Sequence, residues 1–392
     1  MALQDIRGIR LGSRPRPGSG DFSRDLDQYV AGNKLLLLPT GGEVYRSMWE
    51  AIQSARETIH LETYILRSDK TGQRFAEHLE AKARSGVRVR VIFDSVGSLD
   101  LSPVFISRLR NAGVQFLEYH PLAPWRPRWS LVRRDHRKML IVDSRIAFTG
   151  GVNICDDHAP IEDGGSNWHD VHVRLEGPAA FELDRFFRAV WYNETGRWFK
   201  LESPDLGTQG PSKVWAAANQ EFLHRYRIRA AYLGALRAAQ KEVIIANAYF
   251  VPDLRITRAL AAAARRRVQV KILVQGLSDI LSVWYAGRYQ YDYLLRHGVR
   301  LFEWPGPVLH AKTAVVDGLW CTVGSYNLDH RSLLHNLEVN LHVLDPNFSG
   351  ELKKLLESDI ALSPELRLER WRRRPYADKC IERFFYLFRY FF

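Results

Sequence analysis

A duplicated histidine–lysine motif constrains this chain more than any other feature of its sequence. The first copy, His-Arg-Lys-Met-Leu-Ile-Val-Asp, starts at residue 136, and the second, His-Ala-Lys-Thr-Ala-Val-Val-Asp, starts at residue 310. Each copy runs on for seven residues to a glycine and for three more to an asparagine. The repeated positions are His136, Lys138, Asp143, Gly150 and Asn153, and 174 residues later (310 − 136) His310, Lys312, Asp317, Gly324 and Asn327. Two copies in one register predict two related halves that share a site.

The segment between lysine and aspartate is apolar and partly β-branched, which predicts a buried strand. Side chains alternate along a strand, so His136 and Lys138 are expected to point the same way. Asp143 lies an odd number of residues from both and opens the turn dipeptide Asp143-Ser144, as Asp317 opens Asp317-Gly318. Catalysis and turn formation are therefore both open as roles for these two aspartates.

Two imidazoles and two ammonium groups in one pocket suit phosphoryl transfer. One histidine would attack phosphorus and the other would protonate the leaving oxygen. The lysines and the amides of Asn153 and Asn327 would hold the non-bridging oxygens as negative charge builds on them. Because side chains supply that charge, we expect neither a metal nor another cofactor. Asp170 and Glu338 follow their motifs by 34 and 28 residues (170 − 136, 338 − 310), either to fix the imidazole tautomers or as solvated strand ends.

Length and charge indicate the class of protein and of partner. The 392 residues are enough for two domains, and a net charge of +12 indicates a polyanionic partner, either nucleic acid or an anionic lipid surface. The odd, widely spaced cysteines Cys155, Cys321 and Cys380 argue against a disulfide framework and a thiolate metal site. No segment reaches the roughly 20 apolar residues of a membrane span, and the start of the chain has no signal-peptide pattern. Any membrane contact is therefore expected to be peripheral.

Strands and helices alternate in the same order before and after residue 212. This order predicts an α/β fold of two similar lobes, each a mixed, largely parallel sheet flanked by helices, related by a pseudo-twofold axis with one shared active site. The expected parts are a flexible N-terminus (1–30), lobe 1 (31–203), a linker (204–212), lobe 2 (213–362) and a basic, aromatic tail (363–392).

An acidic segment, residues 155–168, lies between the first motif and Asp170. It holds Asp156, Asp157, His158, Glu162 and Asp163. Clustered oxygen ligands can hold a metal, but the spacing matches no metal loop. We predict a solvated loop at the mouth of the site.

With these two motifs, the chain resembles the phospholipase D superfamily, whose signature is HxKxxxxD followed by G-[GS]-x-N in duplicate. Within residues 30–360 it is most similar to the bacterial cardiolipin synthases of the B type. The local matches are Arg133 and Arg134 before the first motif, the runs Val173-Arg174-Leu175-Glu176-Gly177-Pro178 and Ile244-Ile245-Ala246-Asn247-Ala248-Tyr249-Phe250, and Gly324-Ser325-Tyr326-Asn327-Leu328-Asp329. Two departures are Gly151, where the second copy has Ser325, and the lack of an Arg331-Ser332 equivalent in the first copy.

The resemblance implies a phosphatidyl transfer through a phosphohistidine. His136 would take the phosphatidyl group of one phosphatidylglycerol, with His310 as general acid and then base, and a second phosphatidylglycerol would accept it to give cardiolipin and glycerol. The resemblance also implies the supporting residues, namely the phosphate ligands Lys138, Lys312, Asn153 and Asn327 with Ser325 beside them, and the histidine partners Asp170 and Glu338.

Two stretches are candidates for attachment to the cytoplasmic side of the bacterial inner membrane. The first contains Trp125, Arg126, Arg128 and Trp129, which combine charge and aromatic area as a headgroup interface does. The second begins at Arg372-Arg373-Arg374 and ends in an aromatic run, and its alternative interpretation is a helix packed on the body.

Other functions compete with this prediction. A hydrolase or nuclease of the same superfamily would use identical chemistry at phosphorus, although the Arg–Trp clusters favour a lipid over nucleic acid. A catalytically inactive membrane-binding protein is disfavoured because both motifs are intact. Donor and acceptor lipids, the order of the two histidines and the oligomeric state are not set by the sequence.

Overall fold

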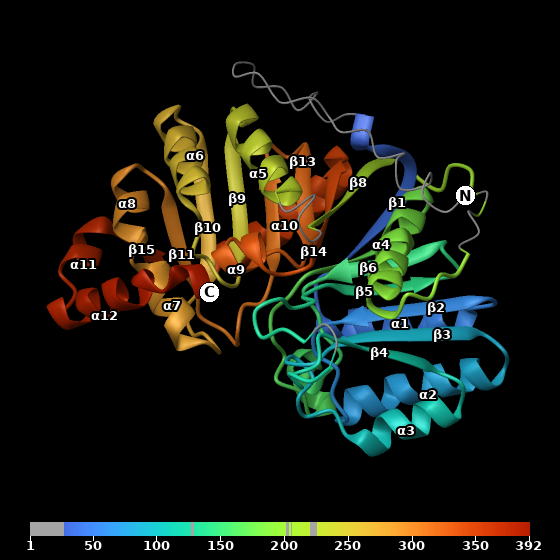
Figure 1. Ribbon diagram of the computed structural model, residues 1–392. Coiled ribbons are helices and arrows are strands. Elements are labelled where there is room, and N and C mark those ends of the chain that lie inside the picture. The colour runs from blue at the N-terminus through green and yellow to red at the C-terminus, as the bar shows by residue number, and fades with distance from the viewer. Residues whose placement is uncertain (1–26, 127–128, 201–203, 205, 220–225) are drawn as a thin grey trace.

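One continuous sheet runs through the whole molecule (Figure 1). The computed structural model describes residues 27–126, 129–200, 204, 206–219 and 226–392. Residues 1–26 of the predicted N-terminal segment, Arg128 and part of the predicted linker lie outside this range. Within it, fifteen strands pair in the order β15-β11-β10-β9-β12-β13-β14-β8-β1-β7-β6-β5-β2-β3-β4.

Lobe 1 comprises the elements before the linker. They are β1 (Val30–Leu38), α1 (Gly41–Ser54), β2 (Thr58–Thr63), α2 (Lys70–Arg84), β3 (Arg88–Asp94), α3 (Pro103–Asn111), β4 (Gln115–Tyr119), β5 (Lys138–Val142), β6 (Ile146–Gly150), the short turns η2 (Asp156–His158) and η3 (Ile161–Asp163), β7 (His172–Glu176) and α4 (Pro178–Thr195).

Lobe 2 repeats this order and is followed by the tail. Its elements are β8 (Ser212–Asn219), α5 (Arg227–Ala238), β9 (Glu242–Asn247), α6 (Leu254–Arg265), β10 (Gln269–Gln275), α7 (Leu281–Arg288), α8 (Tyr291–Arg296), β11 (Arg300–Trp304), β12 (Lys312–Val316), β13 (Trp320–Gly324), α9 (His330–Leu334), β14 (Glu338–Leu344) and α10 (Pro346–Ala361). The tail holds β15 (Glu365–Leu366), α11 (Leu368–Arg372), α12 (Tyr376–Leu387) and η4 (Arg389–Phe391).

The strand order reads the same from both ends. When β8 to β14 are matched with β1 to β7, lobe 2 reads 4-3-2-5-6-7-1 and lobe 1 reads 1-7-6-5-2-3-4, with β15 added at one edge. The lobes meet where β8 pairs with β1 (Figure 1). This palindrome is the signature of the predicted pseudo-twofold axis. The mixed sheet flanked by helices is likewise confirmed.

The expectation of a largely parallel sheet is wrong. Among the strands of the described residues, only β2-β3-β4 and β9-β10-β11 pair in parallel, and the other strand pairs are antiparallel. For the pairs β5–β6 and β12–β13, the reason lies in the turns after the motif strands. Asp143 and Ser144 have φ of 51° and 52°, and Asp317 and Gly318 have 54° and 66°. Two successive positive φ values make a tight hairpin, which returns the chain antiparallel instead of crossing over.

The helices cover both faces of the sheet, and most of the core of the described residues falls into three large clusters. Helices α4 and α10 lie on one face, and their apolar side chains join a single cluster with residues of both lobes, including Phe187 and Leu352. The opposite face is covered by α1–α3 in lobe 1, through residues such as Phe75, and by α5, α6 and α8 in lobe 2, through residues such as Leu260. The cluster around α4 and α10 fixes one lobe against the other.

Candidate active site

Backbone hydrogen bonds join the lobes beside both motif histidines. The His136 amide donates to the Leu337 carbonyl at 3.0 Å, and the Leu337 amide donates to Arg134 at 2.9 Å. The second motif repeats the arrangement, since the His310 amide donates to the His169 carbonyl at 2.7 Å. Glu338 directly follows Leu337 and Asp170 directly follows His169. Each histidine is therefore placed next to a carboxylate of the opposite lobe.

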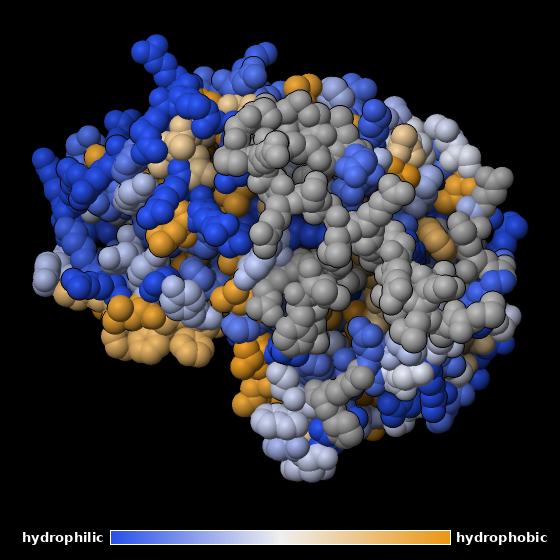
Figure 2. Space-filling view, turned by 45° about the horizontal axis from the view of Figure 1, so that its top comes forward, coloured by the Kyte–Doolittle hydropathy of each residue, from blue (hydrophilic) through white to orange (hydrophobic). Residues whose placement is uncertain are grey.

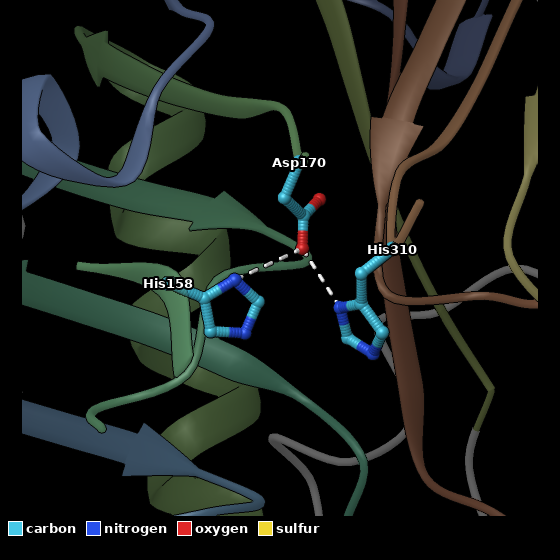
Figure 3. A group of neighbouring side chains, drawn as sticks. All are labelled: His158, Asp170 and His310. Atoms are coloured by element: carbon cyan, nitrogen blue, oxygen red, sulfur yellow. Dashed lines mark hydrogen bonds and ion pairs between the residues drawn. The ribbon is translucent and has the colours of Figure 1, made fainter. Parts of the chain in front are cut away.

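The resulting histidine–carboxylate pairs are crossed between lobes. Nδ1 of His136 lies 3.1 Å from both carboxylate oxygens of Glu338, and Nδ1 of His310 lies 2.8 Å from Oδ2 of Asp170. Figure 3 shows Asp170 and His310 reaching toward each other from the two lobes. All four groups are buried. A carboxylate on Nδ1 fixes the ring and the tautomer, and leaves Nε2 as the reactive atom.

The two carboxylates are held differently. Glu338 accepts hydrogen bonds from Ser325 Oγ (2.5 Å), Ser332 Oγ (2.7 Å) and Asn336 Nδ2 (3.2 Å). Asp170 accepts one from the amide of Val171 at 2.7 Å. A side chain at Gly151 would place its Cβ 2.3 Å from Asp170 Oδ1. The glycine where the second copy has Ser325 is therefore required by the close approach of Asp170.

Both motif lysines are buried beside the histidines of their own motifs. Lys138 Nζ donates to the carbonyl of His136 at 2.7 Å and lies 5.2 Å from the centre of the Tyr64 ring. Lys312 Nζ donates likewise to the carbonyl of His310. Burial lowers the pKa of Lys138 to about 7 and that of Lys312 to about 8. These ammonium groups form a strong site for an anion, because a bound negative charge would offset their loss of hydration.

The same environment keeps the imidazoles neutral. Burial, followed by the charges of Lys138 and Lys312, lowers the pKa of both His136 and His310 well below the usual range. Burial also raises the pKa of Glu338 to about 7. A neutral imidazole is the form that attacks phosphorus.

Two motif asparagines lie in the same buried region. Asn153 accepts a hydrogen bond from the Ile65 amide at 3.2 Å, and its buried Nδ2 has no hydrogen-bond partner among the described residues. Asn327 has a buried Oδ1 without a partner in the same part of the chain, and turning that amide over would present its NH₂ instead. Each amide therefore keeps hydrogen-bonding capacity for a phosphate oxygen.

Asp143 and Asp317 are not brought to this site, which corrects their place among the catalytic candidates. The Asp143 carboxylate accepts hydrogen bonds from the amides of Arg56, Glu57 and Thr58 at 2.7–2.8 Å. The Asp317 carboxylate binds the amides of residues 240–242 in the same way at 2.8–2.9 Å. Both lie at the far ends of the strands that follow the histidines, five residues of strand away from the motif lysines. They tie the hairpin turns to the strand starts.

The prediction of a solvated loop holds for residues 161–164, which are exposed, but residues 155–159 are buried or half-buried and include a residue whose place in the site the sequence analysis missed. Asp156 accepts from the Thr71 amide at 2.9 Å and Asp157 binds Arg67 at 2.8 Å. His158 is fully buried, with Nδ1 3.8 Å from Asp170 Oδ2 and its ring 5.3 Å from that of His310 (Figure 3). Neither ring nitrogen of His158 has a hydrogen-bond partner in the described residues. A histidine at the end of an acidic run was the only signal for it.

His158, Asp170 and His310 place their ligand atoms within 4.8 Å of one another, as a metal site would. The charges of Lys312 and Lys138 act on the same group and lower the pKa of His158, after burial as the main cause. Two ammonium groups oppose a cation here. The donor set therefore fits an anion between the histidines better than a metal.

The basic insertion before the first motif exposes aromatic side chains. Trp125 is 84% exposed and Trp129 43%, while Arg126 is paired with Glu118 at 2.7 Å. The last residues of the insertion are anchored, since the buried Arg134 binds Asp94.

The tail packs on lobe 2 along one side only. Phe385 and Tyr386 of α12 stack on Tyr285 and Tyr289 at 5.7 and 4.3 Å between ring centres. The outer side exposes the large apolar residues Ile381, Phe384, Leu387 and Phe388. Hydrophobic side chains gather at the lower left of Figure 2, on the side of α12 in Figure 1.

The three arginines of the tail differ in their surroundings. Arg372 and Arg373 are exposed, whereas Arg374 is paired with Glu382 and lies against the Trp371 ring. The charge of Arg374 is thus neutralised by a contact within the protein. Among the helices of the described residues, none has the length and apolar character to cross a bilayer.

Known proteins share both the sequence and the fold. The family described as "Cardiolipin synthase, PLD-like domain" matches residues 48–191 and 232–360. Cardiolipin synthase B of Salmonella typhi is 39% identical over 341 residues, covering 84% of this chain and 81% of that protein. Cardiolipin synthase A of Yersinia pseudotuberculosis is 34% identical over 370 residues, covering 92% and 76%.

Among solved structures, phosphatidylserine synthase of Haemophilus influenzae aligns with a TM-score of 0.70 at 14% identity, covering 91% of this chain and 95% of that one. Because the two sequences are only 14% identical, this likeness supports the fold alone. The duplicated motif, the matched segments and the identity to these relatives together show that the chain belongs to the cardiolipin synthase family with phospholipase D-like domains.

Proposed function

We propose that this protein is a cardiolipin synthase that transfers a phosphatidyl group between two phosphatidylglycerol molecules through a phosphohistidine. The observation that carries the proposal is the pair of crossed histidine–carboxylate contacts, which presents two imidazoles and two lysines to one anion at the lobe boundary. Family membership supplies the lipid class, and the geometry supplies the two steps.

In the first step, Nε2 of His136 attacks the phosphorus of phosphatidylglycerol. The P–N bond forms, the bond from phosphorus to the glycerol headgroup breaks, and His310 gives its proton to the departing oxygen. His310 must be protonated for this, although Lys312 and Lys138 hold its pKa low in the empty site. The phosphodiester brings a negative charge that offsets the lysines, so substrate binding itself raises the pKa of His310.

In the second step, the neutral His310 takes a proton from the free hydroxyl of a second phosphatidylglycerol. That oxygen attacks phosphorus, the P–N bond breaks, and His136 is regenerated with cardiolipin as product. Glu338 orients His136 throughout, with Ser325, Ser332 and Asn336 fixing its oxygens. Lys138, Lys312, Asn153 and Asn327 hold the non-bridging oxygens.

We further propose that the enzyme works as a peripheral protein on an anionic bilayer, at the cytoplasmic side of the inner membrane. Trp125 and Trp129 in lobe 1 and the outer side of α12 in lobe 2 expose aromatic and apolar side chains. Such side chains enter the headgroup region, and the net charge of +12 adds attraction to anionic lipid.

The decisive experiment incubates the protein with phosphatidylglycerol vesicles and identifies products by mass spectrometry. Cardiolipin and glycerol are expected in equal amounts, and His136→Ala should abolish both. Phosphatidic acid as the main product would make water the acceptor and overturn the transferase assignment. A parallel reaction with labelled DNA tests the nuclease alternative, and cleavage there with no lipid turnover would also overturn the proposal.

A further inference from the structure

A cavity of about 830 Å³ lies between helices α6 and α8 and the C-terminal helices α11 and α12. None of its lining residues belongs to the two motifs or to their carboxylate partners. We call it the tail groove. Arg258 of α6 and Arg383 of α12 lie on its walls, Trp371 and Gln290 are among its buried lining residues, and Cys380 lines it from α12.

The groove carries more positive charge than its acids can neutralise. Seven of the lining side chains are cationic and two, Asp292 and Glu382, are carboxylates. Arg288 and Arg374 share Glu382, while Arg296 and Arg372 share Asp292 at 2.6 and 3.5 Å.

Three cations of the groove, Arg258, Arg383 and Lys379, have no carboxylate partner among the residues that the structure describes. Arg258 and Arg383 are exposed, and their side chains have no ion-pair or hydrogen-bond partner among the residues that the structure describes. Lys379 donates only to a backbone carbonyl, at 2.7 Å. Cations that line a cavity and have no carboxylate partner fit an anionic group, and the planar fork of arginine matches the oxygens of a phosphodiester.

The wall formed by α12 continues directly into its apolar outer side. Arg383 lines the groove, and the next residue, Phe384, is 55% exposed on the outer side together with Leu387 at 64%. Tyr293 and Tyr376, which also line the groove, are exposed. The basic and aromatic residues of α12 are thus placed as a lipid headgroup requires, and the adjoining apolar side is placed as its acyl chains require.

We propose that the tail groove binds the headgroup of an anionic phospholipid, as a second lipid site separate from the catalytic one. Its volume suits a single headgroup, while the acyl chains would lie along Phe384 and Leu387. The proposal rests on the proposed function in that the enzyme works on an anionic lipid surface. A nucleic-acid strand would gain nothing from the apolar side of α12, which is why a lipid fits better.

Cys380 offers a direct measurement of groove occupancy. It is the exposed cysteine on the groove wall, whereas Cys155 and Cys321 are buried. Its alkylation by a maleimide can be timed with monomeric dihexanoyl phosphatidylglycerol, so that no bilayer shields the thiol. His136→Ala is used as the background to prevent turnover. The rate should fall about tenfold at ten times Kd, since protection scales as 1 + [L]/Kd.

The controls test whether protection depends on the charge of the headgroup, on a lipid rather than free phosphate, and on the arginines of the groove. Dihexanoyl phosphatidylcholine, which is neutral overall, should leave the rate unchanged, and so should inorganic phosphate. The double variant Arg258→Gln/Arg383→Gln should lose the protection by phosphatidylglycerol. The matched double variant Arg255→Gln/Arg265→Gln removes the same charge from exposed positions outside the groove and should keep it.

Several outcomes would overturn the assignment. Equal protection by phosphatidylcholine would make the groove a merely apolar site, and equal protection by inorganic phosphate would make it a free-anion site. Protection that survives Arg258→Gln/Arg383→Gln would place the lipid elsewhere, and stronger protection by an oligonucleotide would assign the groove to nucleic acid. Cardiolipin formation by the wild-type protein is measured separately, so a failed groove and a failed transferase give different results.

Discussion

At the scale of single residues, the two halves of the site share their chemistry and differ in their support. Glu338 is held by two hydroxyls and an amide. Asp170 accepts a hydrogen bond from a backbone amide and lies 3.8 Å from His158, whose ring nitrogens have no hydrogen-bond partner in the described residues. His136 therefore has the more firmly fixed carboxylate, which suits the nucleophile.

Replacing Ser332 with Ala tests this support. The Glu338 carboxylate would lose a 2.7 Å hydrogen bond, and a hydrogen bond to a charged group contributes about 1.5–3 kcal/mol. We expect kcat to fall at least about tenfold with little change in KM. Ser349→Ala, another buried serine away from the site, is the control. A KM effect alone would mean that Ser332 acts on binding instead.

The pH dependence of substrate binding follows from the lysines. Lys138 and Lys312, with pKa values of about 7 and about 8 in the empty site, lose their positive charge as the pH rises through those values. A bound phosphodiester favours the charged forms, so binding should take up protons. We expect KM for phosphatidylglycerol to rise above pH 7–8, and titration calorimetry in buffers of different ionisation enthalpy to report proton uptake. Binding without proton uptake would contradict these lysine pKa values.

The position of His158 predicts that this residue supports His310 and Asp170 during turnover. Its ring packs 5.3 Å from His310 and contacts Trp168 edge-on at 5.5 Å. His158→Gln should lower kcat about tenfold by loosening His310 and Asp170, and should shift the acid limb of the pH–rate profile. A purely structural role would lower the melting temperature and leave that limb in place, so both are measured.

At the scale of elements, the hairpin turns decide the role of the motif aspartates. Asp143→Ala would leave three backbone amides near the start of β2 without their carboxylate partner. This loss should lower the free energy of unfolding by about 1–3 kcal/mol. We expect a lower midpoint in urea denaturation with kcat unchanged in the folded protein. Asp317→Ala in lobe 2 should behave alike. A large loss of kcat at full stability would restore the catalytic interpretation.

The elements also show what a sequence can predict. The predicted alternation of strands and helices in both halves is confirmed, because apolar periodicity and glycine stops are local signals. The antiparallel pairing of β5 with β2 was missed, because these strands lie far apart in the chain and no local signal sets their relative direction. The burial of His158 was missed because a run of acidic residues is typical of a solvent-exposed loop. The sequence does not show which groups Asp156 and Asp157 bind.

At the scale of the whole molecule, the lobes depend on each other. The cluster around α4 and α10 contains residues of both, and each histidine takes its carboxylate from the other lobe. Residues 1–203 and 213–392, produced as separate chains, should each be inactive and prone to aggregate through the exposed edges of β1 and β8. Producing them together should restore turnover in proportion to the complex isolated by gel filtration. Activity of either fragment alone would refute the shared site.

The palindromic strand order has a consequence for the direction of the reaction. In a perfectly symmetric arrangement, the two imidazoles would be interchangeable, and either could be phosphorylated first. In the present chain, the extra hydroxyls on one side and the additional imidazole on the other make the two positions inequivalent. Exchanging those neighbours between the halves, rather than altering either reactive ring, is the change that would reverse which ring carries the covalent intermediate.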